Sequence, residues 1–159
     1  MSDQQRNKHL LKIRSIANYQ FEAPVGDKLF PTDVELRFSK RTGRVRHIYY
    51  NNRLLATLKP TDGLFSLTIH GAKRLWSLAS RIQKIIVRRD IEAFVKKGKN
   101  VFAKHVIHAD DRIRAGDEVL VTNQDDVLLA VGKATLSGSE ISAFKRGVAV
   151  KIRQGIDEA

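Results

Sequence analysis

A lysine-rich stretch near the middle of the chain carries the residue types best suited to bind an anion. Four lysines lie around one glycine there, and an asparagine and a phenylalanine are interspersed among them. Lysine neutralises nucleic-acid phosphates, and such contacts supply most of the affinity of a non-specific complex. The stretch therefore predicts a phosphate-binding loop; the alternative is a solvated, lysine-rich surface loop of a protein from a hot or salty habitat. Its residues are Lys96, Lys97, Gly98, Lys99, Asn100, Phe102 and Lys104.

Two expected elements position this loop. Residues 90–95 predict one short helix, with Asp90 placed as its N-cap. Gly98 lies where the C-terminus of a helix favours a left-handed residue. Residues 101–108 alternate between apolar and polar side chains, which predicts a strand. The lysines are thus expected to gather around a helix end and the turn into a strand.

The charge of the chain favours a polyanionic partner. The 159 residues carry a formal net charge of +12, and the isoelectric point is about 10.2. Residues 1–108 hold 22 basic and 8 acidic side chains, a net of +14, whereas residues 109–159 hold 7 and 9, a net of −2. An uneven distribution favours a basic face with a function over a uniform device for solubility.

Composition also excludes several classes of protein. Cysteine is absent, which excludes disulfides, zinc ribbons, iron–sulfur clusters and thiol nucleophiles. Residues 1–9 lack the apolar core of a signal peptide, and no apolar run approaches the roughly 20 residues that span a bilayer. The apolar fraction of 42% suffices for a folded core. We expect a soluble cytoplasmic protein with no membrane association.

The remaining titratable residues predict no catalytic or metal site. Asp62 lies in a Thr-Asp-Gly turn, where an acid that bonds its own backbone is commoner than a catalytic carboxylate. Asp110 and Asp111 lie near arginines, which favours plain salt bridges. His105 and His108 are three apart in the expected strand and would face opposite sides. Because the Gly-x-Ser-x-Gly elbow and Gly-rich nucleotide motifs are also absent, we expect no metal, no cofactor and no catalytic residue.

Hydrophobic patterns divide the chain into two α+β halves, residues 1–80 and 81–159. In the first half, Asn51-Asn52 predicts a two-residue hairpin turn because asparagine tolerates positive φ. The elements expected there are a helix over 8–18, strands over 34–38, 44–50, 53–58 and 64–69, and a helix over 70–80.

The second half is dominated by short strands. Ser139 is expected to cap a single helical turn that reaches Phe144. Several short strands with one or two small helices predict a strongly curved sheet or a closed barrel. The expected strands cover 84–87, 101–108, 118–122, 127–134 and 146–153.

Four segments of the second half, taken in order, resemble the PUA domain, the RNA-binding module named after pseudouridine synthases and archaeosine transglycosylases. They are residues 97–104 (KGKNVFAK), 114–119 (RAGDEV), 129–134 (LAVGKA) and 144–151 (FKRGVAVK). In the first half, residues 58–68 (LKPTDGLFSLT), followed by His70-Gly71-Ala72, resemble the small α/β domain that precedes the PUA module in archaeal archaeosine tRNA-guanine transglycosylases.

The resemblance implies a fold and a ligand. The fold is α+β, with a small N-terminal α/β domain that contains an antiparallel sheet, followed by a PUA-type β-barrel. The ligand is RNA, most of all the acceptor end of tRNA, held by the glycine-containing loop, the following strand and parts of the last strand. On this sequence these positions are Lys96, Lys97, Gly98, Lys99, Asn100, Phe102 and Lys104, with Arg146, Lys151 and Arg153 from the last strand.

Individual roles follow from the resemblance as well. Gly98 would let an RNA backbone approach closely, and Asn100 would bond a ribose or a base edge. Phe102 has two interpretations: an exposed ring that stacks on a terminal base, or a core side chain at the start of a strand.

The resemblance does not extend to catalysis. This chain has no room for a catalytic barrel of roughly 250 residues. We therefore expect a non-catalytic accessory RNA-binding protein of tRNA modification or RNA metabolism, with a separate catalytic subunit as a candidate partner. The alternatives are a small RNA-modifying enzyme with an unrecognised site, or a module that binds an acidic protein or a small metabolite.

Overall fold

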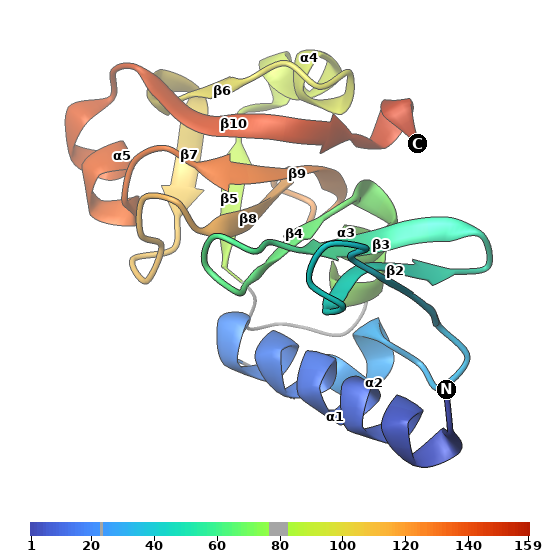
Figure 1. Cartoon of the computed structure of the whole chain (residues 1–159). Coiled ribbons are helices and arrows are strands. Elements are labelled where there is room, and N and C mark those ends of the chain that lie inside the picture. The colour runs from blue at the N-terminus through green and yellow to red at the C-terminus, as the bar shows by residue number, and fades with distance from the viewer. Residues whose placement is uncertain (23, 77–82) are drawn as a thin grey trace. The chain divides into compact units, whose positions relative to one another are not determined.

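The computed structural model describes residues 1–22, 24–76 and 83–159. The chain forms two compact units, Met1–Arg81 and Ile82–Ala159, each built around its own sheet (Figure 1). Helices are combined with sheets whose strands are mostly antiparallel, which confirms the predicted α+β class. Within the described ranges, no helix is both long enough and apolar enough to cross a lipid bilayer.

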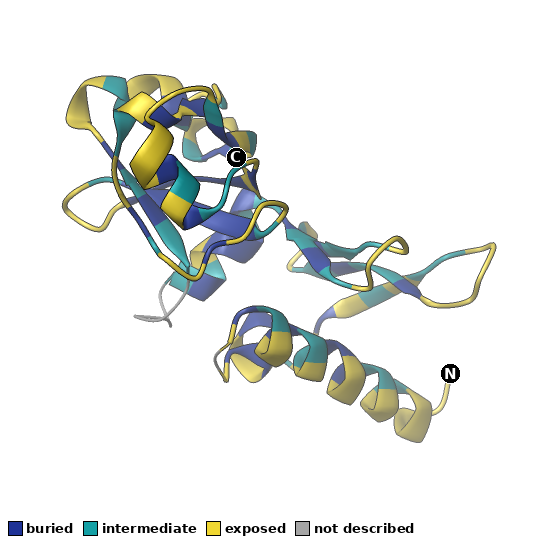
Figure 2. Ribbon diagram, turned by 90° about the vertical axis from the view of Figure 1, so that its left-hand side faces the viewer, coloured by how far each residue is buried: buried dark blue, intermediate teal, exposed yellow. Residues whose placement is uncertain are grey.

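The first unit begins with the long helix α1 (Asp3–Gln20). The Ser2 hydroxyl accepts a hydrogen bond from the Gln5 N–H at 3.2 Å, and Gln5 Oε1 accepts one from the Ser2 N–H at 3.0 Å. This reciprocal capping box starts the helix earlier than the predicted range of 8–18. One face of α1 is buried and the other is exposed (Figure 2), and its buried residues are Leu10, Ile13 and Ala17.

The sheet of the first unit is an antiparallel meander in the order β1-β2-β3-β4. Asn51 and Asn52 join β2 to β3 with φ values of +49° and +63°, which confirms the predicted two-residue turn. The strands are β1 (Glu35–Phe38), β2 (Val45–Tyr50), β3 (Arg53–Leu58) and β4 (Phe65–Leu67).

Two shorter helices complete the first unit, α2 (Gly26–Leu29) and α3 (Ile69–Trp76). The predicted strand over 64–69 ends at Leu67 because α3 begins at Ile69, and the Thr68 hydroxyl accepts the Gly71 N–H at 3.3 Å at the start of that helix. The predicted helix over 70–80 matches α3 as far as Trp76, and its remainder lies outside the described residues. The Phe30 and Phe65 rings, 5.0 Å apart, lie in the core between these elements.

The second unit is a six-stranded, nearly closed barrel in the order β6-β10-β9-β8-β5-β7. Strands β5 and β8 pair in parallel, and the other neighbours pair antiparallel. The expected hairpin between residues 118–122 and 127–134 is present. The strands are β5 (Lys84–Val87), β6 (Val101–Phe102), β7 (Val106–Ala109), β8 (Glu118–Thr122), β9 (Leu128–Ala134) and β10 (Val148–Gly155).

The single strand predicted over 101–108 is wrong. The chain forms a 3₁₀ turn, η2 (Ala103–His105), between β6 and β7. The Ala103 N–H donates to Gly147 O at 2.9 Å, and the Arg88 N–H donates to His105 O at 3.0 Å. One segment thus pairs first with β10 and then with β5, the two strands that would otherwise end the sheet. The turn is the corner that closes the barrel.

Two predicted helix caps are also wrong. A 3₁₀ turn, η1 (Arg89–Ile91), precedes α4 (Glu92–Lys96), and the Asp90 carboxylate pairs with Arg88 at 3.0 Å instead of capping the helix. The helix α5 (Gly138–Phe144) is capped by Ser137, not by Ser139, because Ser137 forms a capping box with Glu140. A last 3₁₀ turn, η3 (Ile156–Glu158), follows β10.

Candidate nucleic-acid interface

The lysine loop, defined as residues 96–104, begins at a well-formed helix end. The Gly98 N–H donates to Val95 O at 2.9 Å, and the Lys99 N–H donates to Phe94 O at 3.1 Å. These two bonds form a Schellman motif, which requires a left-handed residue at Gly98. Its φ of +92° confirms that prediction. The motif fixes the backbone that carries Lys97 and Lys99, and both of these residues are exposed.

A carboxylate lies against the glycine of this loop. A Cβ built on Gly98 would collide with Oε1 of Glu158, which also accepts a hydrogen bond from the Gly155 N–H at 2.8 Å. The missing side chain at Gly98 therefore makes room for Glu158 in this structure. The approach of an RNA backbone at Gly98 stays a prediction, and it would require the Glu158 side chain to move.

Asn100 links the loop to the last strand. Its Oδ1 accepts the Ile152 N–H at 3.0 Å, which joins positions 52 residues apart in the sequence. Its amide Nδ2 has no hydrogen-bond partner within the part of the chain that the structure describes. The side chain is thus held by its oxygen and presents its two N–H donors to a ligand.

Phe102 is 44% exposed, so its alternative interpretation as a core residue is wrong. Its ring meets the His105 ring edge-on, with 6.3 Å between the centroids. Lys104 lies in η2 and is exposed. Stacking of Phe102 on a base stays a prediction, and the exposure of the ring is compatible with it.

Strand β10 runs beside the loop, so the structure brings the two predicted groups of residues together (Figure 1). Val148 is paired with Phe102, and the residue before it, Gly147, accepts the Ala103 N–H. Arg146 is exposed next to this contact, and Lys151 is exposed one residue before the backbone group that holds Asn100. The predicted residues of the loop and of β10 therefore lie on paired strands of one barrel, and their role as an RNA site stays a prediction.

Arg153 has an intramolecular partner that the sequence did not predict. Its guanidinium forms a bidentate ion pair with the Glu118 carboxylate, with Arg153 Nη2 at 2.8 Å from Oε1 and Nη1 bonded to Oε2. The Glu118 side chain is only 4% exposed, so this carboxylate depends on Arg153 for its charge balance. Arg153 lies at an irregularity in the β9–β10 register and has a structural role there.

Lys133 belongs beside the predicted residues, and sequence reasoning missed it. It lies directly opposite Lys151 in the β9–β10 pair, and both lysines are exposed. Lys133 also lies opposite Glu118 in the β8–β9 pair, so these three charged residues are cross-strand neighbours on β8, β9 and β10. The signal that could have identified Lys133 is its place in the 129–134 segment (LAVGKA), one of the four segments that resemble the PUA domain.

The two carboxylates considered above are structural. Asp62 Oδ1 accepts the Leu64 N–H at 2.9 Å, and its Oδ2 pairs with Lys59 at 3.0 Å, which confirms the turn interpretation. Burial acts to raise the pKa of Asp62, but the hydrogen bonds from Leu64 and Lys59 outweigh it and the pKa is lowered. Asp110 pairs with Arg112 at 2.8 Å, and mainly this bond lowers the pKa of Asp110.

Among the described residues, no three of the His, Cys, Asp and Glu side chains are grouped so that they could hold a metal ion. The 3₁₀ turn between His105 and His108 replaces the strand in which they were expected to alternate. Anion binding by the lysine loop and β10 stays a prediction.

Comparison with known proteins agrees with this geometry. Residues 11–81 match the family model of the patch-forming domain C2 of tRNA-guanine transglycosylase, and residues 83–156 match that of the PUA domain. The chain is a PUA-domain protein. Its fold is similar to that of a conserved PUA-domain protein from Thermoplasma acidophilum, at 19% identity and a TM-score of 0.64 over 94% of this chain and 89% of that one. A hypothetical protein from Pyrococcus horikoshii is similar at 21% identity and a TM-score of 0.70, over 93% of this chain and 90% of that one.

The sequence of this PUA-domain protein is also similar to the C-terminal region of archaeal enzymes. It is 43% identical over 148 residues to the tRNA-guanine(15) transglycosylase of Methanobrevibacter smithii, which covers 92% of this chain and 22% of the enzyme. It is 44% identical over 154 residues to that of Pyrococcus furiosus, which covers 96% of this chain and 26% of the enzyme. The chain thus spans about a quarter of the length of the relatives that it matches. The matched region includes both of its units.

Proposed function

We propose that this PUA-domain protein binds RNA along the lysine loop and β10, and that its ligand is the acceptor end of a tRNA. The observation that carries the proposal is the exposure of Lys97, Lys99, Phe102 and Lys151 on the loop and on the strand that pairs with it. The match to a domain pair of tRNA-guanine(15) transglycosylases supports tRNA as the class of RNA.

Electrostatics supports a phosphate ligand at the lysine loop and β10. Lys97, Lys99 and Lys104 form no ion pair within the described residues, so their charges are available to phosphates. Lys133 and Lys151 lie opposite each other in the β9–β10 pair, and both charges would attract a phosphate bound beside them. The Schellman motif holds the loop in place beforehand, which lowers the entropy lost on binding.

The lysine loop also offers groups that recognise single-stranded RNA instead of a duplex. The exposed Phe102 ring can stack on an unpaired base, and the Asn100 amide can donate to a ribose or a base edge. Both groups lie on strand or loop backbone that is hydrogen-bonded to the barrel. This combination favours the unpaired 3′ end of a tRNA over its stems.

We further propose that the chain is non-catalytic and serves a separate catalytic subunit of tRNA modification. The matched region is about a quarter of the length of its relatives, and its described residues contain no group of metal ligands. Incubation of this chain alone with tRNA and labelled guanine should leave the tRNA unlabelled. Incorporation of label would contradict the proposal.

The ligand is tested with two forms of the same tRNA, intact and trimmed of its single-stranded 3′ tail. Stacking on an aromatic ring contributes about 1 kcal/mol or more per base, so trimming should weaken binding by about fivefold or more. Removal of the anticodon arm is the matched control and should change the affinity little. Footprints confined to the anticodon arm, or equal affinity for any duplex of the same length, would overturn the assignment.

A further inference from the structure

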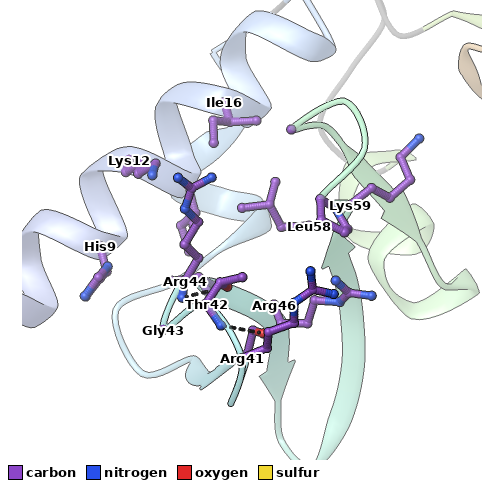
Figure 3. A pocket seen from close by; sticks show the side chains of 15 residues that line it. His9, Lys12, Ile16, Arg41, Thr42, Gly43, Arg44, Arg46, Leu58 and Lys59 are labelled. Carbon is purple, nitrogen blue, oxygen red and sulfur yellow. Dashed lines mark hydrogen bonds between the residues drawn. The ribbon is translucent and has the colours of Figure 1, made fainter.

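A second basic site lies entirely within the first unit. A pocket of about 430 Å³ opens between α1, the β1–β2 connection and the β3–β4 turn (Figure 3). Its volume falls in the range of pockets that hold small organic ligands, roughly 300–1,000 Å³. It shares no residue with the lysine loop or β10, and the sequence analysis assigned no function to its residues.

The rim of the pocket is cationic. Lys59 is paired with Asp62 at 3.0 Å, whereas the other four cations of the rim have no carboxylate within ion-pair distance among the described residues. Their summed positive potential would attract an anion to the rim. The four cations are Lys12 from α1, Arg41 and Arg44 from the β1–β2 connection, and Arg46 from β2.

Hydrogen bonds fix the backbone of the turn that carries Arg41 and Arg44. The connection is closed by two bonds, from the Ser39 N–H to Arg44 O and from the Gly43 N–H to Ser39 O, both 2.8 Å long. The Thr42 N–H also donates to Ser39 Oγ at 3.3 Å, and Thr42 Oγ1 accepts the Arg44 N–H at 3.3 Å. The rim is therefore a structured turn, and Figure 3 shows the Arg44 side chain extending from it toward α1.

The floor of the pocket is apolar. Ile16 from α1 and Leu58 from β3 project into the space between the helix and the sheet (Figure 3), and the buried Ile13 also lines the pocket. An inorganic anion gains nothing from such a floor, whereas a nucleoside buries one face of its base against it. The combination of a cationic rim and an apolar floor matches a phosphate joined to a flat apolar group.

We propose that this pocket receives one unpaired nucleotide of the bound RNA, with its phosphate at Lys12, Arg44 and Arg46 and its base over Ile16 and Leu58. The inference rests on the proposed RNA-binding function and adds a second contact, in the first unit, to the one along the lysine loop. The two contacts are separable because they use different residues.

The test uses the full chain and two small probes, adenosine 5′-monophosphate and ribose 5-phosphate, which carry the same phosphate charge. Hydrogen bonds to charged groups contribute about 1.5 kcal/mol or more, so R44Q/R46Q should weaken binding of adenosine 5′-monophosphate by about tenfold or more. Ribose 5-phosphate should bind wild type more weakly than adenosine 5′-monophosphate, because it lacks the base. The K97A/K99A variant should bind adenosine 5′-monophosphate like wild type.

NMR chemical shifts of the backbone amides of the wild-type chain test the site without any variant that could misfold. Addition of adenosine 5′-monophosphate should change these shifts around residues 12–16 and 39–46. The inference would be overturned by equal binding of the two probes or by amide shifts centred on residues 96–104. It would also be overturned if polyglutamate bound the pocket and the nucleotide did not. If tRNA binds wild type and is weakened by K97A/K99A while R44Q/R46Q has no effect, this inference fails and the proposed function stands. If tRNA does not bind at all, the proposed function fails.

Discussion

At the scale of single residues, Lys97 and Lys99 are the side chains on which the proposed function depends most directly. Both are exposed on a backbone fixed by the Schellman motif. If each contacts one phosphate, K97A/K99A should reduce the slope of log K against log salt concentration by about 1.4 to 1.8. The measurement is a titration of tRNA binding at several salt concentrations.

The control for this double variant needs two exposed lysines without an ion pair. Lys8 and Lys28 meet this requirement within the described residues, so K8A/K28A removes the same charge from α1 and α2. Arg6 is unsuitable because its guanidinium donates to Val34 O at 2.7 Å. An unchanged slope in K97A/K99A, or an equal change in K8A/K28A, would mean that the loop lysines are merely solvated.

Gly98 is under two constraints, a positive φ and the contact with Glu158. A non-glycine residue at such a φ costs about 1 kcal/mol or more, so G98A should lower the free energy of unfolding by that amount plus the cost of moving Glu158. G98V should be more destabilising and should also weaken tRNA binding. Urea denaturation and tRNA titration measure the two effects.

Gly116 provides the matched control because its φ is +95° and a Cβ there meets nothing closer than the end of the Lys133 side chain. G116A should therefore report the backbone cost alone. The excess cost of G98A should disappear in the E158A background, where the carboxylate is gone. Equal costs for G98A and G116A in the wild-type background would show that Glu158 moves without penalty.

At the scale of elements, local signals were predictable and long-range closure was not. The turn at Asn51-Asn52 and the left-handed Gly98 follow from the φ that each turn requires, which the residue type reveals. The cap of α5 is also encoded locally, because Ser137 and Glu140 have the spacing of a capping box, but the prediction placed it wrongly at Ser139. The 3₁₀ turn over 103–105 could not be predicted from local sequence, because it connects β6 and β7, which pair with the distant strands β10 and β5.

The candidate site divides in the same way. Its lysine loop was predicted from a cluster of charges. The basic residues of β10 were predicted from the resemblance of local segments to the PUA domain. The ion pair between Arg153 and Glu118 joins residues 35 positions apart, and the cationic pocket of the first unit assembles from α1 and three parts of the sheet region. No local pattern encodes either arrangement.

Strand β10 therefore contains two basic residues with different expected roles. R153A removes the guanidinium that bonds both oxygens of the buried Glu118 carboxylate and should lower the free energy of unfolding by about 3 kcal/mol. K151A removes an exposed charge opposite Lys133 and should leave stability nearly unchanged while weakening tRNA binding. Thermal unfolding and tRNA titration of both variants measure these effects. Loss of tRNA affinity without loss of stability in R153A would contradict the structural role.

At the scale of the whole molecule, the net charge of +14 over residues 1–108 includes the cationic pocket and the lysine loop. The cationic pocket belongs to the first unit and the lysine loop to the second. Each site alone can neutralise a few phosphates. Because counterion release scales with the number of phosphates neutralised, sites that act on one RNA contribute additively to the salt dependence.

Additivity gives a prediction about the intact protein. The variant with all four substitutions, K97A/K99A/R44Q/R46Q, should lower the slope of log K against log salt concentration by about 2.8 to 3.6, the sum of four phosphate contacts. Its loss of tRNA affinity should equal the product of the two separate losses, because side chains without shared partners contribute independently. A combined variant that binds tRNA no more weakly than K97A/K99A would show that the lysine loop and β10 hold the RNA without the pocket. Losses that multiply would mean that one tRNA is held by both units of the chain.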